Sequence, residues 1–476
     1  MKLGLSVASV AAIGLVAAPA IGAPSGGDGE ARLEAGAARI DITPTPAELK
    51  RPMPVRDALF ARAIFIRRAT DCAILVGLDL PSIDNASADR VIEKLAKSAG
   101  CARDHIIVSA THVHSAGAAA DTEQRQARIE AAIAEAVSRA KAEARPAKLS
   151  FGTTAVDLNT NRDLLSDGRW MVGPDPAGHS DKTLAVLALR DEANQPIAAY
   201  LNYAMHPVNY NRVPIVSADF AGEASAYIER RFGGNMVALF AQGASGDQNP
   251  RFLQPLNTLR GELWGLADMR ATGLDAEEGG AIVARERQGT ARFEREAPAE
   301  IAAGRSDAYA AALENVDELV RAEGAILGEA AIAAMRFSSS EPRSDPVIKG
   351  AHRLLQCPGR DRTDKADPVL MGELPAYVDG APVTIRTGML RIGDVHIAAV
   401  NGELYSEIAE RMKAALPDRA LMVTTLANGS ANSGYIYSDD AASRLTFTVI
   451  GSRLKPGCAD RAIVAAAAAM AGELSK

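Results

Sequence analysis

The 476-residue chain is long enough for a large core, and its length alone allows about three domains. A formal net charge of -7 at pH 7, without basic clusters, argues against nucleic acid as a partner. Aromatic residues make up only 4% of the sequence, which also argues against stacking platforms for single strands.

Residues 1–23 have the pattern of a secretory signal peptide: Met1-Lys2, a mostly apolar stretch, and small residues at the end. Beyond them, no apolar run approaches the roughly 18 residues that a membrane-spanning helix requires. We therefore expect an exported protein, periplasmic or secreted, without a membrane span.

A strand, a helix and a second strand are predicted in succession over residues 72–79 (CAILVGLD), 85–99 and 106–110. This spacing predicts a right-handed parallel crossover. In such units ligands gather beyond the carboxyl ends of the strands. At this position the sequence has Asp79 at the end of the first strand and the run Thr-His-Val-His-Ser, residues 111–115, after the second.

The two histidines of this run are candidates for a metal or catalytic centre. In an extended backbone alternate side chains share a face, so we expect His112 and His114 to point the same way. A strand cap or a local hydrogen bond is the alternative for an isolated His-x-His. Asp79 is a candidate to orient a ligand histidine, or else a turn residue that ends its strand.

Four cysteines in an exported protein permit two disulfides. Cys72 and Cys101 directly precede the two strands that we expect to be parallel neighbours. The favoured bridges are therefore Cys72–Cys101 and, by remainder, Cys357–Cys458. Neither pair has the CxxC spacing of zinc or thioredoxin motifs, so we expect structural bridges.

Other polar candidates also follow predicted strands. A hairpin over residues 184–204 leads to His206, and a strand over residues 395–400 is followed by Glu403. The charged, weakly periodic segment 252–305 predicts a surface insertion or lid. Helices are predicted over residues 122–144, 218–232, 404–416 and 460–470, and a long helix opens at Ser306. Together these patterns predict an α/β fold with mixed, largely parallel sheets covered by helices.

Eight segments resemble, in order, the zinc-dependent N-terminal catalytic domain of the neutral/alkaline non-lysosomal ceramidase family. They are GAARIDITP (36–44), IIVSATHVHSAG (106–117), NRD (161–163), NYAMHP (202–207), SADFAGEAS (217–225), LFAQGASGDQNP (239–250), NGELYSEI (401–408) and SGYIYSDDA (433–441). One such motif is weak evidence, whereas eight in order extend over nearly the whole chain beyond the signal peptide.

The resemblance implies a catalytic zinc ion, Zn2+, held by His112, His206, Glu403 and Tyr435. Neutral imidazoles and a carboxylate with an open position suit a catalytic zinc, whereas the tyrosine ligand follows from the resemblance alone. Read singly, His206 also fits a strand-end histidine and Glu403 a first-turn helix residue. We expect the remaining histidines to be structural or surface residues; they are His105, His179, His352 and His396.

The resemblance also implies two catalytic residues beside the metal, His114 and Arg162. Both could stabilise the negative charge that forms when metal-activated water attacks a carbonyl. Asn249 stands where the family motif Gly-Asp-Val-Ser-Pro has its serine, and an amide cannot serve as a hydroxyl nucleophile. Either metal-activated water acts alone, or the reaction is not ceramide cleavage. Asn249 and Asp247 are still catalytic candidates, as a substrate contact and as a base or supporting group; a Gly-rich turn is the alternative.

Neutral ceramidases typically add a C-terminal immunoglobulin-like sandwich, whereas residues 460–470 have a helical pattern. The resemblance therefore predicts one metallohydrolase domain over residues 30–476, with the 252–305 insertion and without that sandwich.

The leading hypothesis is an exported zinc-dependent hydrolase that cleaves an amide bond in a small-molecule or lipid-like substrate, an N-acyl amide or a ceramide-like compound. An esterase or another carbonyl hydrolase at the same site is one alternative. A non-catalytic protein that binds metal, lipid or carbohydrate is the other. Asn249 favours this last reading, whereas the intact set of His112, His206 and Glu403 argues against it.

Overall fold

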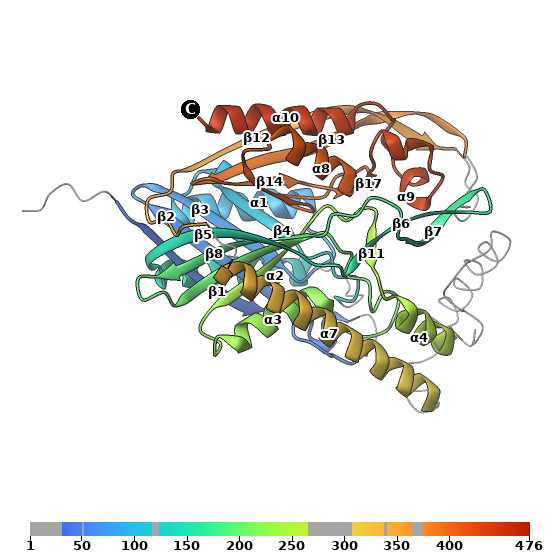
Figure 1. Ribbon diagram of the computed structural model, residues 1–476, viewed down its shortest axis with the longest axis horizontal. Coiled ribbons are helices and arrows are strands. Elements are labelled where there is room, and N and C mark those ends of the chain that lie inside the picture. The colour runs from blue at the N-terminus through green and yellow to red at the C-terminus, as the bar shows by residue number, and fades with distance from the viewer. Residues whose placement is uncertain (1–30, 50–51, 117–122, 265–306, 338–339, 364–374) are drawn as a thin grey trace, which may run out of the picture. The chain divides into compact units, whose positions relative to one another are not determined.

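Two β-sheets packed face to face form the centre of the molecule, and helices cover the outer face of each (Figure 1). The computed structural model describes residues 31–49, 52–116, 123–264, 307–337, 340–363 and 375–476. Arg32–Lys476 forms one compact unit. The predicted signal peptide lies outside the described residues.

The larger sheet has the strand order β10-β9-β8-β5-β1-β2-β3-β4. Its strands are β1 (Leu33–Asp41), β2 (Phe60–Arg68), β3 (Asp71–Leu78), β4 (Ile106–Ala110), β5 (Arg145–Ala155), β8 (Thr183–Asp191), β9 (Pro196–Tyr203) and β10 (Val237–Gln242). The mixed α/β class is confirmed, but the expectation of a largely parallel sheet is wrong. Only β3–β4 and β9–β10 are parallel pairs, and the other five are antiparallel. Short turns such as those of β2–β3 and β8–β9 can join only antiparallel neighbours.

The second sheet has the order β12-β13-β14-β16 and consists of β12 (Ile348–Arg362), β13 (Tyr377–Ile392), β14 (Val395–Val400) and β16 (Ala420–Thr424). Two small sheets lie near the candidate site. One is β11-β6-β7, formed by β6 (Asn159–Ser166), β7 (Arg169–Asp175) and β11 (Gln248–Pro250). The other pairs β15 (Glu403–Leu404) with β17 (Tyr435–Ile436).

The helices of the described residues are α1 (Asn85–Ala99), α2 (Glu123–Ala142), α3 (Asp219–Arg231), α4 (Gln254–Trp264), α7 (Asp307–Phe337), α8 (Ser406–Ala415), α9 (Phe447–Ile450) and α10 (Ala459–Leu474). Short 3-10 helices occupy Pro46–Glu48, Arg103–His105 and Asp440–Ser443. Buried apolar side chains of α1, α2, α3 and α7 pack on one side of the larger sheet. Those of α8 and α10 pack on the outer side of the second sheet. The chain thus forms four layers, helices, sheet, sheet and helices (Figure 1).

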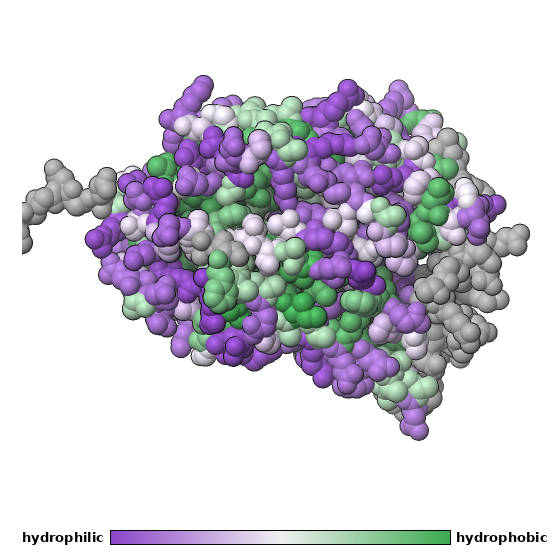
Figure 2. Space-filling model, in the orientation of Figure 1, coloured by the Kyte–Doolittle hydropathy of each residue, from purple (hydrophilic) through white to green (hydrophobic). Residues whose placement is uncertain are grey.

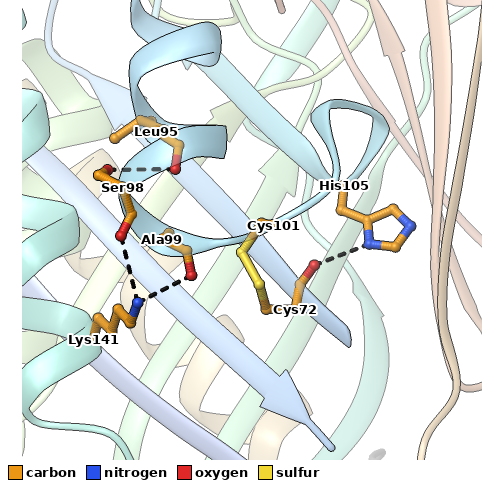
Figure 3. Close-up of a disulfide and its surroundings, with 7 residues drawn as sticks. All are labelled: Cys72, Leu95, Ser98, Ala99, Cys101, His105 and Lys141. Carbon is orange, nitrogen blue, oxygen red and sulfur yellow. Dashed lines mark hydrogen bonds between the residues drawn. A yellow bond between two sulfur atoms is a disulfide. The ribbon is translucent and has the colours of Figure 1, made fainter. Parts of the chain in front are cut away.

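The predicted crossover is present as β3, α1 and β4, with β3 and β4 parallel. Gly100, with φ 76°, ends α1 in the left-handed conformation that favours glycine. Both favoured disulfides, Cys72–Cys101 and Cys357–Cys458, are formed. Figure 3 shows the first of them, where Lys141 of α2 also donates to the carbonyl of Ala99 at 3.0 Å. Two disulfides fit an exported protein.

The larger sheet is strongly curved, and this curvature positions the candidate site. In strand order β10 and β4 are the two edges, yet β10 packs against β2, β3 and β4. Gly77 of β3 makes room for this contact, since a Cβ there would lie 2.8 Å from the side chain of Leu239 in β10. The chain segments that follow β4 and β9 are therefore brought together.

The segment predicted as an insertion begins inside the core. Its residues 254–264 form α4, and Leu256 and Leu259 are buried against α7. The remainder of the 252–305 segment, from residue 265, lies outside the described residues. No helix in the described ranges is long and apolar enough to cross a membrane. The face drawn in Figure 2 is mainly hydrophilic, with separate apolar areas between the charged residues.

Gly36 provides a test of the packing between β1 and α2. A Cβ at this position would lie 2.1 Å from the carbonyl oxygen of Ala140, which is backbone and cannot rotate away. We expect Gly36→Ala to destabilise the fold by about 1–3 kcal/mol, because α2 must shift. The control Gly472→Ala meets no atom within 4 Å in α10 and should be neutral or stabilising by up to about 1 kcal/mol. Denaturant unfolding measures both, and equal stability of the two variants would contradict this account of the packing.

Candidate metal centre

His112 lies in a turn rather than in a strand. β4 ends at Ala110, and the backbone of His112 has φ 67°, a left-handed conformation that costs a non-glycine residue roughly 1 kcal/mol or more. A hydrogen bond from its N–H to the carbonyl of Leu80 at 3.0 Å helps to hold the turn. The prediction that strand alternation aligns the two histidines is therefore wrong. The rings of His112 and His114 still meet, with centroids 4.8 Å apart.

Three side chains from distant parts of the sequence converge at this turn. His112 Nε2 lies 2.9 Å from His206 Nε2 and 3.1 Å from Glu403 Oε2. His206 Nε2 and the same carboxylate oxygen are 3.4 Å apart. His206 is fully buried after the end of β9, and Glu403 begins β15. In a tetrahedral zinc site with bonds of 2.0–2.1 Å, neighbouring ligand atoms are about 3.3 Å apart, which is close to these spacings.

Backbone carbonyls fix the protons of both histidines. His112 Nδ1 lies 2.7 Å from the carbonyl oxygen of Pro81, and His206 Nδ1 lies 2.8 Å from that of Ser245. A carbonyl oxygen only accepts, so each Nδ1 carries a hydrogen and the neutral ring has its lone pair on Nε2. Two lone pairs and a carboxylate facing one another repel unless a positive charge lies among them. The donor set therefore fits a metal ion.

The electrostatics of the buried His206 and the partly buried Glu403 agree with a metal ion among these side chains. Burial lowers the pKa of His206 to about 4, and Arg162 and His112 act in the same direction, so the imidazole is neutral at pH 7. Burial disfavours the charge on Glu403, but the neighbouring His112 and His206 hold the pKa of its carboxyl well below the usual range. Neutral imidazole and ionised carboxylate are the forms that bind metal.

His114 completes a cluster of three histidines. Its Nε2 lies 3.4 Å from His112 Nε2, and one nitrogen from each of His112, His114 and His206 falls within 4.8 Å of the others. The surrounding protein and the two other imidazoles lower the pKa of His114, although solvent at this exposed residue screens part of the effect. The geometry thus offers His114 both to the metal position and to the solvent side, where a substrate would enter.

Tyr435 lies directly opposite Glu403 in the parallel β15–β17 pair. Burial raises the pKa of Tyr435, and the adjacent Glu403 adds to the rise while Arg162 opposes it, so the phenol retains its proton at neutral pH. Tyr435 therefore lies beside the cluster and faces the carboxylate as a neutral hydroxyl, and its role as a metal ligand stays a prediction.

Arg162 and Asn249 form a second polar group beside Tyr435. The buried guanidinium of Arg162 lies 5.3 Å from the ring centre of Tyr435 and 5.4 Å from that of Phe447. Its Nη1 donates to Asn249 Oδ1 at 3.1 Å, and its Nη2 donates to the carbonyl of Gly246 at 2.6 Å. Its Nε has no hydrogen-bond partner within the described protein. No sequence pattern marks Phe447, because a single aromatic residue at the start of the four-residue helix α9 is not distinctive.

Asp247 supports the backbone rather than facing the cluster. Its Oδ1 accepts from the N–H of Ser406 at 2.8 Å, and its Oδ2 accepts from the Ser406 hydroxyl at 2.8 Å and from Asn161 Nδ2 at 3.2 Å. Burial raises the pKa of Asp247 to about 7. These contacts hold the start of α8, three residues after Glu403. Asp247 is therefore better suited to a supporting role than to the role of a general base.

Asp79 does not orient a histidine. Its Oδ2 accepts from the N–H of Phe60 at 2.9 Å and from Arg62 Nη1 at 2.7 Å. The hypothesis that it supports a ligand is therefore wrong, since carbonyls of Pro81 and Ser245 take that role. The other four histidines bind elsewhere, as expected: their partners are Cys72 O for His105, Glu410 for His179, Asp104 for His352 and Asp394 O for His396.

Comparison with known proteins agrees with this fold. Residues 53–264 match the family model described as "Neutral/alkaline non-lysosomal ceramidase, N-terminal". This confirms the predicted resemblance: over this segment the chain is similar to the neutral/alkaline ceramidase family. The match contains His112, His114, Arg162 and His206, whereas Glu403 lies beyond it.

Solved structures of ceramidases share the fold. One, described as "Ceramidase complexed with C2", has a TM-score of 0.68 at 17% identity and covers 94% of this chain and 75% of its own. A neutral ceramidase from Pseudomonas aeruginosa has a TM-score of 0.66 at 18% identity, with 93% and 74% covered. No curated protein sequence matches the chain. The family supports an amide-bond hydrolase.

Single histidine variants separate ligands from neighbours. We expect His112→Ala and His206→Ala to lose tightly bound transition metal, because each removes a lone pair from the converging set. If His114 faces substrate, His114→Ala retains about one equivalent of metal; loss of metal from this variant would make it a ligand instead. His352→Ala, at an exposed histidine paired with Asp104, is the control. Plasma mass spectrometry of the reconstituted proteins gives the metal content.

Chelation provides an independent check on the wild-type chain. Removing metal leaves the acceptors of His112, His206 and Glu403 facing one another, so the thermal midpoint should fall by several degrees and return when zinc is added. A thermal midpoint that changes neither with chelator nor with added zinc would contradict a metal ion at this position.

Proposed function

We propose that the protein is an exported zinc-dependent hydrolase that cleaves the amide bond of an N-acyl amide or a ceramide-like lipid. The observation that carries the proposal is the convergence of His112 Nε2, His206 Nε2 and Glu403 Oε2 within 3.4 Å, with the imidazole protons held on the far nitrogens. Residues 112–116 and 206 lie within the ceramidase family match, and the two disulfides support export.

The side chains around the cluster have different roles in amide hydrolysis, namely metal binding and oxyanion stabilisation. When bound, zinc polarises a carbonyl and makes water a stronger nucleophile at neutral pH. His112, His206 and Glu403 hold the metal in this proposal, with Tyr435 as a fourth ligand or as a donor to the carboxylate. Arg162 presents a cation and a free Nε–H, and His114 lies on the solvent side. Such groups stabilise the oxyanion that develops when a carbonyl is attacked.

Asn249 acts on Arg162 in this proposal. Its side-chain oxygen accepts from Arg162 Nη1, so this position orients the guanidinium and supplies no nucleophile. A reaction that relies on metal-activated water needs no serine there. The identity of the acyl and amine parts of the substrate then depends on the surface around the site, and esters of similar shape are the nearest competing substrates.

A turnover assay tests the proposal. Zinc-reconstituted wild-type protein should hydrolyse members of a panel of N-acyl amides, including ceramide, faster than the matched esters relative to their spontaneous rates. Glu403→Ala and His112→Ala should reduce kcat/KM by about 10³-fold or more, whereas His352→Ala should not. A larger rate enhancement for the esters than for the amides would instead favour an esterase. Saturable binding without turnover would favour a binding protein.

Arg162 offers a more specific test of oxyanion stabilisation. We expect Arg162→Lys to lower kcat by about 10²-fold with little change in KM, because an ammonium cannot keep the contacts to Asn249 and Gly246 while also donating to substrate. Arg169→Lys, at an exposed arginine on the adjacent strand β7, is the matched control. A change confined to KM would assign Arg162 to ground-state binding.

A further inference from the structure

A second group of buried oxygens lies outside the histidine cluster, between the loop after His206 and the helices α3 and α7. Asp219 is the first residue of α3 and is fully buried, and Glu323 in the middle of α7 is 1% exposed. Asn209, also fully buried, joins them: its Nδ2 lies 2.9 Å from Asp219 Oδ1 and 2.7 Å from Glu323 Oε2.

Within the described part of the chain, this group has no compensating positive charge. Among the described residues, no lysine, arginine or histidine forms an ion pair with Asp219 or Glu323, and burial together with the charge of Asp219 disfavours the ionised form of Glu323. One side-chain oxygen on each residue also has no hydrogen-bond donor in the described ranges: Asp219 Oδ2, Glu323 Oε1 and Asn209 Oδ1. Two unpaired carboxylates in a protein interior carry a large desolvation cost. A cation would remove it.

Asn209 can act as a ligand without moving its backbone. A half-turn of its amide exchanges nitrogen for oxygen, and Oδ1 then lies 2.7–2.9 Å from a carboxylate oxygen on each side. In an octahedral Mg²⁺ site with bonds of 2.0–2.1 Å, adjacent ligand oxygens are about 2.9 Å apart, whereas the longer bonds of Ca²⁺ give about 3.4 Å. Carboxylate and amide oxygens are the ligands that both ions prefer.

We infer that Asp219, Glu323 and Asn209 bind one hard divalent cation, with the ligand spacing of Mg²⁺, at a site separate from the histidine cluster. Asp219, whose carboxylate is fully buried, has a strained left-handed backbone with φ 53°. The cation joins three segments, the loop after His206, the start of α3 and the middle of α7. It therefore stabilises the loop that carries His206.

Metal counting on zinc-saturated protein tests this inference, because zinc then fills the histidine cluster. In equilibrium dialysis we expect one additional Mg²⁺ per chain, with weaker binding of Ca²⁺, and a rise of the thermal midpoint by about 3 °C or more at saturating Mg²⁺. Glu323→Gln should lose the additional ion and the thermal response. Glu318→Gln makes the same change at an exposed position of α7 and should retain both.

The measurement on the wild-type protein alone can contradict the proposed cation site. Absence of additional Mg²⁺ or Ca²⁺, together with a midpoint that neither ion changes, would mean that a shared proton neutralises the two carboxyls. An equal response in a folded Glu323→Gln protein would place the ion elsewhere. If Glu323→Gln does not fold, Asn209→Ala removes one ligand and should weaken Mg²⁺ binding at least 10-fold. None of these results depends on whether the histidine cluster hydrolyses amides.

Discussion

Two backbone carbonyls determine the chemistry of the histidine cluster. Pro81 O and Ser245 O each hold the Nδ1 proton of one imidazole, at 2.7 and 2.8 Å. The Nε2 lone pairs must then face each other at 2.9 Å, beside the carboxylate of Glu403. A protein interior tolerates this arrangement only around a positive charge. The metal preference of the site therefore comes from how the main chain is held as much as from the identity of the ligands.

The folding of the larger sheet supplies that main-chain geometry. His112 follows β4 and His206 follows β9, and these strands are far apart in sheet order. The curvature that packs β10 against β3 and β4 brings the two following turns together. Glu403 comes from a third region, the β15–β17 pair beyond the second sheet, where Tyr435 is its direct neighbour. Both sheets must therefore be packed before the acceptors converge, so the candidate metal centre depends on the complete fold.

Local patterns predicted the elements better than their arrangement. The β3–α1–β4 crossover, the β8–β9 hairpin and both disulfides followed from apolar runs, turn residues and cysteine positions. The prevalence of antiparallel pairing could not be predicted in this way, because strand pairing between distant segments leaves no local sequence pattern. The convergence of His112, His206 and Glu403 was accessible only through the family resemblance. Asp79 was a reasonable candidate by position, but the buried Arg62 beside it competes for the carboxylate.

The buried carboxyl pair of Asp219 and Glu323 could be predicted neither from local patterns nor from the family resemblance. Glu323 stands in a long helix, where a single glutamate usually faces solvent, and only the packing of α7 on α3 buries it. The sequence around Glu323 therefore does not indicate that its carboxyl group is buried without a positively charged partner.

The loop from His206 to Asp219 connects the two oxygen- and nitrogen-rich centres. His206 and Asn209 are three residues apart, so the loop begins at one centre and contacts the other almost at once, and it ends at Asp219. Near its end, the N–H of Ser217 donates to the carbonyl of Ser115 in the turn that carries His112. A displacement of this loop would therefore move ligand candidates on both sides. In the proposed site, a cation that neutralises the buried carboxylates at one end would also help to preorganise the imidazoles at the other, and preorganised ligands favour strong metal binding.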